Sequence, residues 1–576
     1  MPNPPHLLHL WSRRRVVARM VPGQIPTTVP TTEAIFLIVR RMRAPLIVVI
    51  VTFSFCTAGM MLMPGVDADG NPYRLNLFDA FYQMTITLTT VGFTEAPYPF
   101  SYPQRMWMTL SIFLLVISWA YSIGVFLALV QGATFQSAVA AQKFRRQVRR
   151  LVEPFIIVAG YGDAGRIVGA DLDEHYRRFV VIDEREDKVQ SVIAEQLTFD
   201  VPALHGDCSS PAVLGMAGLG HPDCEGVLAL TNDDDTNLAV VMAASMLRPD
   251  LPVLGRCSEN RTRGRMEHFA PDCAINADDR FATYLALSIR QPVVYQLLRW
   301  LMDNDQEQLL PARPDLATRR WVVCADGEFG EEVVTDLAAI GVTVDLADPS
   351  AGDPDVSGAA AFVAGTKNDT INIAMAEHAR HANPDVYVVL RQQNNAKKSL
   401  LETLQTDSVY IATEVIAREV LARILTPTFW SFIEHAITCD DKWATEVRDH
   451  LVQRCGTHTP ERDVITLSAD HAPAIAAWLR RGQTLRLGDL MREPDDRDTI
   501  LPVAALLLVR NGEPMFMPPE DTPLALDDQV LLVGKPSGLS EVDEIRHYPA
   551  TVEYLATGRE VPLTWVWSKL STWVAS

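Results

Sequence analysis

The stretch TTVGFTE (residues 89–95) lies between two uncharged apolar segments, and this placement decides the class of protein. The first segment covers residues 44–63, and the second covers residues 106–131. About 20 apolar residues cross the hydrocarbon core of a bilayer, so the sequence predicts two transmembrane helices. Residues 75–88 are too few to cross and include Asp79, which is typical of a re-entrant helix buried in protein.

A Thr-Val-Gly-aromatic string at this position can offer backbone carbonyls that replace the hydration shell of a monovalent cation. Gly92 permits a backbone conformation that is closed to most residues. The candidate selectivity-filter residues are Thr90, Val91, Gly92 and Phe93. The alternative is an ordinary outer loop that joins two helices.

Basic residues flank the two spans on one side. Arginines cluster before the first span and basic residues fill positions 143–150 after the second, whereas the connecting segment has only Arg74 and Arg105. The positive-inside rule therefore places both termini in the cytoplasm and the filter near the outer face. Residues 34–43 (AIFLIVRRMR) are expected to form a short interfacial helix that leads into the membrane.

Composition limits what the rest of the chain does. A chain of 576 residues leaves room for two or three soluble domains beside the two spans. The net charge of −20 argues against a general nucleic-acid binder. An acidic mass below a pore also raises the local cation concentration, although simple solubility explains the charge equally well. The eight cysteines show no paired spacing, so reduced thiols are expected and no zinc site is indicated.

A nucleotide-binding pattern opens the soluble part. Residues 154–159 are typical of a buried strand, GYGDAG (160–165) follows, and a second strand at 179–182 ends at Asp183. Such glycines permit a tight turn and close approach of a pyrophosphate to a helix N-terminus, and the acid is placed to bind ribose hydroxyls. This order favours a Rossmann fold that binds NAD rather than NADP. The alternative is a Rossmann turn without a ligand.

Further polar residues follow the third and fourth predicted strands. Asp207, Thr231 and Asn232 stand where carboxyl ends of parallel strands face a ligand, although each could equally be a helix cap. The candidate nucleotide-binding residues are therefore Gly160, Gly162, Gly165, Asp183, Asp207, Thr231 and Asn232.

The chain then repeats itself. Residues 158–165 match residues 323–330 at a shift of 165, and residues 249–256 match residues 384–391 at a shift of 135. The second copy thus lacks 165 − 135 = 30 residues, which predicts the loss of a third strand and its helix. Ala325 replaces the first glycine, so we expect the first copy to bind nucleotide and the second to be degenerate.

These features together resemble the bacterial ligand-gated potassium channels that carry two RCK (regulator of K⁺ conductance) domains per chain, a plan shared by calcium-activated large-conductance channels. The resemblance covers nearly the whole chain after residue 30. The matching stretches are the filter residues 90–93, the glycines with Asp183, the crossover helix EVIAREVLARIL (414–425) and the small β-rich lobe at 501–534. An Asn-Gly turn at 511–512 independently supports hairpin strands in that lobe.

The resemblance implies a two-span α-helical pore module, cytoplasmic α/β Rossmann-like RCK domains and a small C-terminal α+β lobe. It also implies a homotetramer in the bacterial inner membrane, with K⁺ in the filter, NAD(H) or an adenine nucleotide as regulatory ligand, and Gly124 as a gating hinge. The alternative role of Gly124 is close helix packing. The expected domains are an N-terminal segment with the interfacial helix (1–43), the pore domain (44–131), a linker (132–152), the first RCK domain (153–312), the second Rossmann lobe (318–435), and the C-terminal lobe and tail (436–576).

Two features depart from the family pattern. Thr94 stands where the family has glycine, which favours a less selective cation channel as an alternative. Residues 271–311 are too few for a C-terminal lobe in the first copy. The chain could instead be a non-conducting regulator of K⁺ transport or an NAD-dependent dehydrogenase, although no catalytic domain is evident. Ca²⁺ is a further possible ligand at the acids Glu328, Glu331, Glu332, Asp345 and Asp348.

Overall fold

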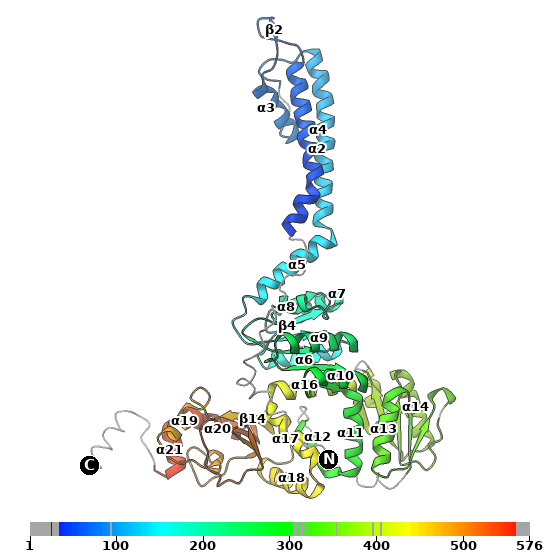
Figure 1. Cartoon of the computed structure of the whole chain (residues 1–576), viewed down its shortest axis with the longest axis vertical. Helices are drawn as coiled ribbons and strands as arrows, with labels where there is room; N and C mark the ends of the chain where they lie inside the picture. Colours follow the sequence, from blue (N-terminus) through cyan, green and yellow to red (C-terminus); the bar gives the residue numbers. More distant parts are fainter. Residues whose placement is uncertain are drawn as a thin grey trace, which may run out of the picture.

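The computed structural model describes residues 34–92, 95–302, 320–352, 354–393, 397–403 and 406–559, together with Ile25, Leu309 and Leu316. Two long helices rise from a larger α/β body (Figure 1). The expected two-span pore module with Rossmann-type domains and a small α+β lobe is therefore confirmed. The filter residue Phe93, its neighbour Thr94 and the tail 560–576 lie outside the described residues.

The two long helices are α2 (Ala34–Leu62) and α4 (Tyr102–Val130), which lie side by side. Met42–Leu62 and Tyr102–Val130 are long and apolar enough to cross a membrane. Many of their apolar side chains are exposed in the single chain, such as Ile50 at 62% and Ile117 at 65%, which suits a lipid or subunit contact. The separate interfacial helix expected at residues 34–43 is not observed, because α2 runs through this stretch without interruption.

A short helix, α3 (Leu77–Leu88), packs against both spans. It is preceded by the paired strands β1 (Gly65–Val66) and β2 (Pro72–Tyr73). The contact core holds Cys56, Met60, Met84 and Met108, all nearly fully buried. The indole Nε1 of Trp107 donates to the carbonyl of Cys56 at 3.0 Å and joins α4 to α2.

The predicted linker is a helix, α5 (Ala133–Val148). It follows α4 after a break at Gln131 and Gly132. Its last turns bury Phe144 and Val148 in the core of the first Rossmann copy, against Leu214 and Leu219. The span is thus connected to that copy by a docked helix (Figure 1).

The first soluble unit is a six-stranded parallel sheet with the strand order β5-β4-β3-β6-β7-β8. This is the 3-2-1-4-5-6 order of dinucleotide-binding folds. Its strands read as continuous apolar runs because helices cover both faces. The strands are β3 (Phe155–Ala159), β4 (Arg178–Asp183), β5 (Ala203–His205), β6 (Cys224–Ala229), β7 (Val253–Cys257) and β8 (Ala274–Asn276). The helices are α6 (Asp163–Glu174), α7 (Glu186–Ala194), α8 (Pro211–Met216), α9 (Asp234–Leu247) and α10 (Asn260–Phe269).

The second sheet is also parallel, with the order β10-β9-β11-β12-β13. It corresponds to the first sheet without its third strand, because only the short η3 (Pro349–Ala351) bridges β10 and β11 in the described residues. The loss predicted from the repeat offset is confirmed. The strands are β9 (Trp321–Ala325), β10 (Val344–Ala347), β11 (Ala361–Gly365), β12 (Tyr387–Gln392) and β13 (Ser408–Ile411). The helices are α13 (Gly327–Ala339), α14 (Asp369–Ala382) and α15 (Lys398–Thr403).

The two copies exchange their crossover helices. Helix α11 (Ala277–Arg290) leaves the first sheet and packs on α13, whereas α16 (Ala412–Leu425) leaves the second sheet and packs on α6. Buried residues on one face of each sheet form one continuous apolar core through this exchange, and the other face of each sheet has a core of its own. Each copy therefore completes the other.

The C-terminal lobe is an antiparallel sheet of order β14-β17-β15-β16 covered by helices. Its strands are β14 (Glu461–Thr466), β15 (Val503–Arg510), β16 (Glu513–Phe516) and β17 (Gln529–Gly534). The hairpin predicted at residues 511–512 is confirmed, with φ of 53° at Asn511 and 86° at Gly512. The remaining helices are α12 (Pro292–Met302), α17 (Pro427–Thr438), α18 (Asp441–Cys455), α19 (Pro473–Arg480), η5 (Leu487–Met491), α20 (Pro536–His547) and α21 (Pro549–Thr557).

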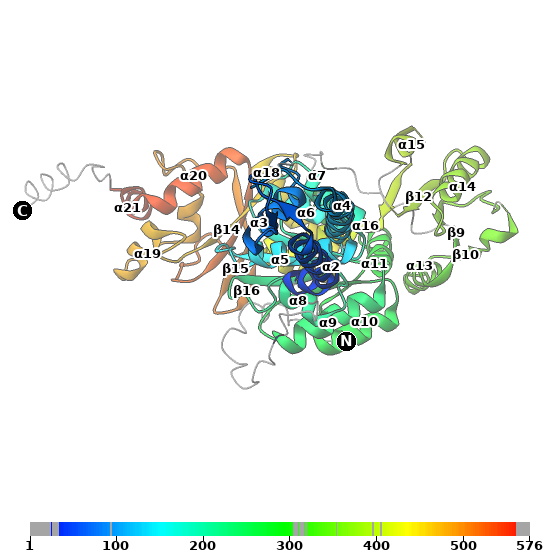
Figure 2. The same cartoon turned by 90° about the horizontal axis from the view of Figure 1, so that it is seen from above.

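The lobe and the second sheet lie on opposite sides of the spans when the molecule is seen from above (Figure 2). Between α12 and β9, the few described residues (309, 316 and 320) contain no strand, in agreement with the expectation that the first copy lacks a lobe of its own.

Candidate functional site

The pore loop begins where α3 ends. The Asn76 side chain caps the start of this helix by accepting from the Asp79 amide at 2.8 Å, and Thr89 closes its end. Beyond it, Thr90 has a φ of 57° and Gly92 a φ of 147°, so the glycine does take a conformation that most residues avoid. A helix C-terminus carries partial negative charge. The end of α3 therefore favours a cation beside Thr90, Val91 and Gly92.

The segment that follows the pore loop is held in place by contacts of Glu95 and Gln83. The Glu95 carboxylate accepts from Arg105 Nε at 2.9 Å, from Arg105 Nη2 at 3.1 Å and from the Phe100 amide at 3.0 Å. Gln83 of α3 donates to the carbonyl of Ala96 at 3.3 Å. These contacts fasten the segment after the filter to α3 and to α4. Sequence reasoning noted the charges but not the pairing.

Gly124 lies within α4, which continues unbroken to Val130. A Cβ at Gly124 would meet no atom within 4 Å, so close packing inside the described chain does not account for this glycine. Its role as a gating hinge stays a prediction. The chain changes direction at Gly132, between the end of α4 and the start of α5. A Cβ at Gly132 would approach the Leu129 carbonyl oxygen at 3.1 Å.

The carboxyl ends of the first sheet meet at Gly160. This residue has a φ of 98°, and a Cβ there would approach the Thr231 amide nitrogen at 2.6 Å. Glycine is therefore required both by the backbone conformation and by the contact between the ends of β3 and β6. Asp183 is the last residue of β4, and Asp207 follows β5 at the same edge of the sheet.

The other two glycines of the motif, Gly165 and Gly162, have different structural roles. A Cβ at Gly165 would overlap the Gly160 carbonyl oxygen, so this glycine allows α6 to lie close to β3. Gly162 caps α6 without any side-chain bond, and a Cβ there would meet nothing within 4 Å. The space beside Gly162 at the start of α6 is therefore open, as a phosphate at a helix N-terminus would need.

Asp183 is nearly buried and organises this turn. One carboxylate oxygen accepts from the Tyr161 amide at 2.7 Å, and the other accepts from the Arg185 amide at 2.8 Å. Tyr161 itself points inward and donates to Glu195 at 2.8 Å, and burial is the main cause that raises the pKa of its hydroxyl. Asp183 therefore shapes the loop, and its ribose contact stays a prediction.

Thr231 is half-buried and is held by hydrogen bonds to Asn237, and its contact with a nucleotide stays a prediction. Asn237 is fully buried and accepts from the Thr231 amide at 3.0 Å and hydroxyl at 2.7 Å. Its amide nitrogen donates to the carbonyls of Thr231 at 2.9 Å and Arg256 at 3.0 Å. Asn232 accepts from Arg256 Nη1 at 2.5 Å. Asp207 forms a local turn by accepting from the Ser209 amide at 2.8 Å.

Comparison with known proteins agrees with this geometry. Residues 156–276 and 331–412 match the TrkA-N domain family. The two Rossmann copies each contain a stretch that matches this family, and we call them the first and second TrkA-N domains after that match. Potassium channel protein 1 of Methanocaldococcus jannaschii is 21% identical over 248 residues, 43% of this chain and 70% of that protein. Probable potassium channel protein 2 of the same organism is 24% identical over 278 residues, 47% of this chain and 76% of that protein.

A solved structure described as a GsuK channel bound to NAD covers 89% of this chain and 100% of its own, with 13% identity and a TM-score of 0.40. The resemblance to potassium channel proteins with RCK domains, inferred from the sequence, is confirmed by the domain and sequence matches.

In the second TrkA-N domain, a buried aromatic side chain stands at the start of α13, the helix that corresponds to α6. Phe329 stands at the position of Ala164, is 2% exposed, and stacks with Phe281 and Tyr410 at centroid distances of 5.7 and 6.1 Å. The Arg391 guanidinium lies 4.4 Å from the Phe329 ring and binds Asp278 of α11 at 2.9 Å. These contacts support the expectation that the second domain is degenerate as a nucleotide site.

The hydrogen bonds by which Asp183 holds its loop have no counterpart at Asp348 among the described residues of the second TrkA-N domain. Asp348, the counterpart of Asp183, accepts from the Ser350 amide at 2.8 Å and hydroxyl at 2.7 Å and caps η3. Asp345 pairs with Arg320 at 2.6 Å, and Glu328 accepts from the Asn260 amide at 3.2 Å. No group of three or more His, Cys, Asp or Glu side chains that could hold a metal is found among the described residues. The acids proposed for Ca²⁺ do not form such a group.

Sequence reasoning missed Arg256, which lies in β7, one residue before the strand ends. Burial lowers the pKa of its guanidinium, and the carboxylates of Asp234, Asp278 and Asp163 lie near enough to oppose that shift. A cation beside the open turn of α6 complements a phosphate. The sequence could have indicated Arg256, because ligands face the carboxyl ends of parallel strands and Arg256 lies near the carboxyl end of β7. Only the strands up to β6 had been considered.

Proposed function

We propose that this chain is one subunit of a homotetrameric K⁺ channel whose opening is controlled by a nucleotide in the first TrkA-N domain. The observation that carries the proposal is the pore loop after α3, set between two exposed apolar helices. Backbone carbonyls of Thr90, Val91 and Gly92 would replace the hydration shell of K⁺, with Phe93 completing the filter. The M. jannaschii relatives are named potassium channel proteins, which supports this assignment.

The nucleotide would be NAD(H) or an adenine nucleotide. Its phosphates would approach the open turn at Gly162, between α6 and Arg256. The pyrophosphate charge suits the amide groups at the start of a helix. No substrate-positioning domain accompanies this cleft among the described residues, so the nucleotide would act as a regulator rather than as a hydride donor.

The signal would reach the pore through α5. This helix is buried in the first TrkA-N domain at Phe144 and Val148 and follows α4 directly. A ligand shifts a channel between two shapes only by binding them with different affinity. Movement of the first sheet would therefore pull on the inner end of α4, with Gly124 and Gly132 as the positions that allow bending.

The membrane arrangement follows from charge. Both termini and the TrkA-N domains would lie in the cytoplasm of a bacterial cell, with the filter toward the outer face of the inner membrane. Four subunits would surround one axis, which would cover much of the apolar surface that α2 and α4 expose. Eight TrkA-N domains would then form the cytoplasmic ring.

The test is a planar-bilayer recording of purified protein in K⁺ and then in Na⁺, with NAD(H), ADP, ATP or Ca²⁺ added on the cytoplasmic side. We expect K⁺-selective current that changes with a nucleotide. Equal K⁺ and Na⁺ currents would replace the proposal with a less selective cation channel, which Thr94 at the filter favours. Absence of current under every condition would favour a non-conducting regulator of K⁺ transport.

A further inference from the structure

Arg391 occupies in the second TrkA-N domain the place that Arg256 occupies in the first. The repeat at a shift of 135 residues pairs the two arginines, and each lies one residue before the end of its strand, β7 or β12. The carbonyl of each accepts from a buried asparagine, Arg256 from Asn237 at 3.0 Å and Arg391 from Asn372 at 2.8 Å. The two guanidinium groups are therefore structural counterparts near the carboxyl ends of equivalent strands.

The partners of the two arginines differ. Arg391 Nη2 donates to both carboxylate oxygens of Asp278, at 3.0 and 2.9 Å, and the Arg391 side chain is only 7% exposed. Asp278 lies in the first turn of α11, the helix that leaves the first sheet. At the same repeat shift, the counterpart of Asp278 is Thr413, in the first turn of α16. Arg256 bonds instead to the side chain of Asn232 at 2.5 Å, and no ion pair of Arg256 is found in the described part of the chain.

Asp278 also lies near Arg256. Strand β8 ends two residues before Asp278, and it pairs with β7 so that Ile275 lies opposite Arg256. Burial is the main cause that raises the pKa of Asp278, and the positive charges of Arg391 and Arg256 oppose that rise. The bonds from Arg391 also favour the charged form of the carboxyl group. One carboxylate thus lies within electrostatic range of two guanidinium groups that belong to different domains.

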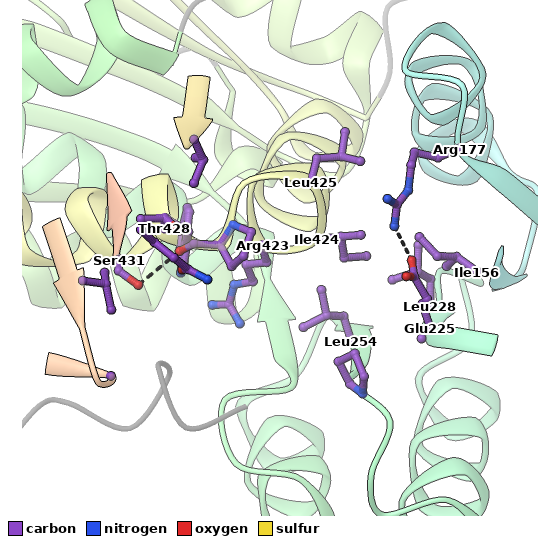
Figure 3. A pocket seen from close by; sticks show the side chains of 18 of the residues that line it. Ile156, Arg177, Glu225, Leu228, Leu254, Arg423, Ile424, Leu425, Thr428 and Ser431 are labelled. Carbon is purple, nitrogen blue, oxygen red and sulfur yellow. Dashed lines mark hydrogen bonds and ion pairs between the residues drawn. The ribbon is translucent and has the colours of Figure 1, made fainter. Parts of the chain in front are cut away.

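The opposite end of the same strands joins the first domain to α16 mainly by apolar contact. Figure 3 shows Leu254 of β7 and Ile424 of α16 beside a cavity of about 420 Å³. Arg177 and Glu225, which also line this cavity, already pair with each other. The charges that a nucleotide at the carboxyl ends would disturb are therefore those around Asp278.

We propose that Asp278 sets the nucleotide affinity of the first TrkA-N domain, because its carboxylate and the nucleotide phosphates compete for the positive charge of Arg256. The inference rests on the proposed nucleotide site beside Gly162 and Arg256. Like charges repel, so the carboxylate weakens binding, whereas Arg391 neutralises the carboxylate and thereby strengthens binding. By linkage, a bound nucleotide leaves Asp278 to Arg391 alone and strengthens the pair that joins the two domains.

The test is calorimetric titration of the purified full chain, at low ionic strength, with ADP and separately with NAD⁺. Asp278→Asn keeps the shape of the side chain and removes its charge, so we expect the nucleotide to bind at least about threefold more tightly. Arg391→Met leaves the carboxylate without its cation, so the nucleotide should bind at least about threefold more weakly. A merely structural role predicts weaker binding in both variants, because each breaks a buried ion pair.

The double variant, Asp278→Asn with Arg391→Met, removes both charges and should bind the nucleotide within about twofold of the wild type. If one single variant fails to fold, the other single variant and the double variant still decide, since a structural role predicts a loss that the second change does not repair. Asp407→Asn is the matched control. It breaks the Arg380–Asp407 pair of the same domain, at 2.7 Å, and should leave the affinity unchanged.

Two negative results are distinguishable. A wild-type chain that binds neither ADP nor NAD⁺ would contradict the proposed function, and this inference with it. A wild-type chain that binds one of them, with an Asp278→Asn variant that binds it equally well or more weakly, would overturn this inference alone.

Discussion

Gly160 and Gly162 are two residues apart, and the structure requires glycine at the first position but not at the second. Gly160 has a φ of 98° and touches the Thr231 amide, whereas Gly162 has a φ of −73° and faces open space. Gly160→Ala is expected to lower the stability of the first TrkA-N domain by about 1–3 kcal/mol, seen as earlier thermal unfolding of the full chain. Gly162→Ala should unfold like the wild type but bind nucleotide more weakly, because its methyl group stands in the path of the phosphates.

Asp183 is expected to be essential for nucleotide binding through the loop that it holds. Replacing it with Ala removes a carboxylate that accepts from the amides of Tyr161 and Arg185. Hydrogen bonds to a charged group contribute about 1.5–3 kcal/mol each, so nucleotide affinity measured by calorimetry should fall at least about tenfold. Asp348→Ala is the matched control in the second domain and should leave affinity unchanged. Equal affinities in both variants would contradict the assignment of the site to the first domain.

At the scale of elements, the contact of α13 with α11 contains a pH-sensitive carboxyl. The pKa of Glu332 is raised to about 7, chiefly by burial and further by the negative charges of Asp279, Asp278 and Glu328, while a bond from Asn260 opposes the shift. The unfolded chain releases this proton near pH 4.3. Between roughly pH 4.5 and 7 the folded chain holds a proton that the unfolded chain has lost, so Glu332 lowers stability as pH rises through that window.

Glu332→Gln should therefore raise the free energy of unfolding at pH 8 by on the order of 1–2 kcal/mol, after allowance for solvent screening. The unfolding temperature should rise accordingly. The gain should shrink toward zero at pH 4. Glu331→Gln, an exposed neighbour on the same helix, should show no such dependence. A stability gain that is the same at both pH values would show that Glu332 does not carry the effect.

The exchanged helices α11 and α16 are joined by one buried carboxylate. Glu419 is 3% exposed and accepts from Arg280 Nε at 2.9 Å and Nη2 at 3.0 Å, besides its pair with Arg423. Glu419→Ala leaves two guanidinium groups without it and is expected to cost about 3–5 kcal/mol in the free energy of unfolding. Glu414→Ala removes the more exposed pair with Arg418 on the same helix and should cost under about 1 kcal/mol. Denaturant unfolding of the full chain distinguishes the two.

Some elements followed from the sequence and others did not, for physical reasons. The missing third strand was predictable because two matched motifs changed their spacing by a fixed number of residues. The hairpin was predictable because Asn511 and Gly512 tolerate the left-handed region that its turn needs. The crossover helix at residues 414–425 was expected only from the family resemblance, since an amphipathic helix by itself indicates that one face is covered but not which sheet covers it.

The candidate site divides in the same way. Gly160, Gly162 and Gly165 were identified because backbone geometry demands glycine at fixed spacing. Asn237 and Arg256 escaped notice because their roles depend on which strand ends become neighbours after folding. Phe329 stacks with residues from two other elements, Phe281 and Tyr410, and no local sequence pattern predicts such a contact.

At the scale of the whole molecule, α5 is the described connection between the first TrkA-N domain and the spans. Phe144 of α5 is 1% exposed in the core of that domain. Under the proposed function, Phe144→Ala should leave nucleotide affinity within a few-fold of wild type but reduce the change in open probability that nucleotide produces. Lys143→Ala, an exposed neighbour, should keep the full response. Single-channel recording and calorimetry on the same preparations measure the two quantities.

The exchange of α11 and α16 also means that separating the two TrkA-N domains by cleavage would leave each without a helix that packs on it in the described structure. A fragment that stops near residue 302 would contain α11 without α13, the helix on which it packs. It would also expose to solvent the face of α6 that α16 covers. Such a fragment should precipitate when produced alone and become soluble when the remainder, from about residue 303 onward, is produced in the same cell. The duplicated halves have become mutually dependent, so neither is now a free-standing module that could be lost or transplanted alone.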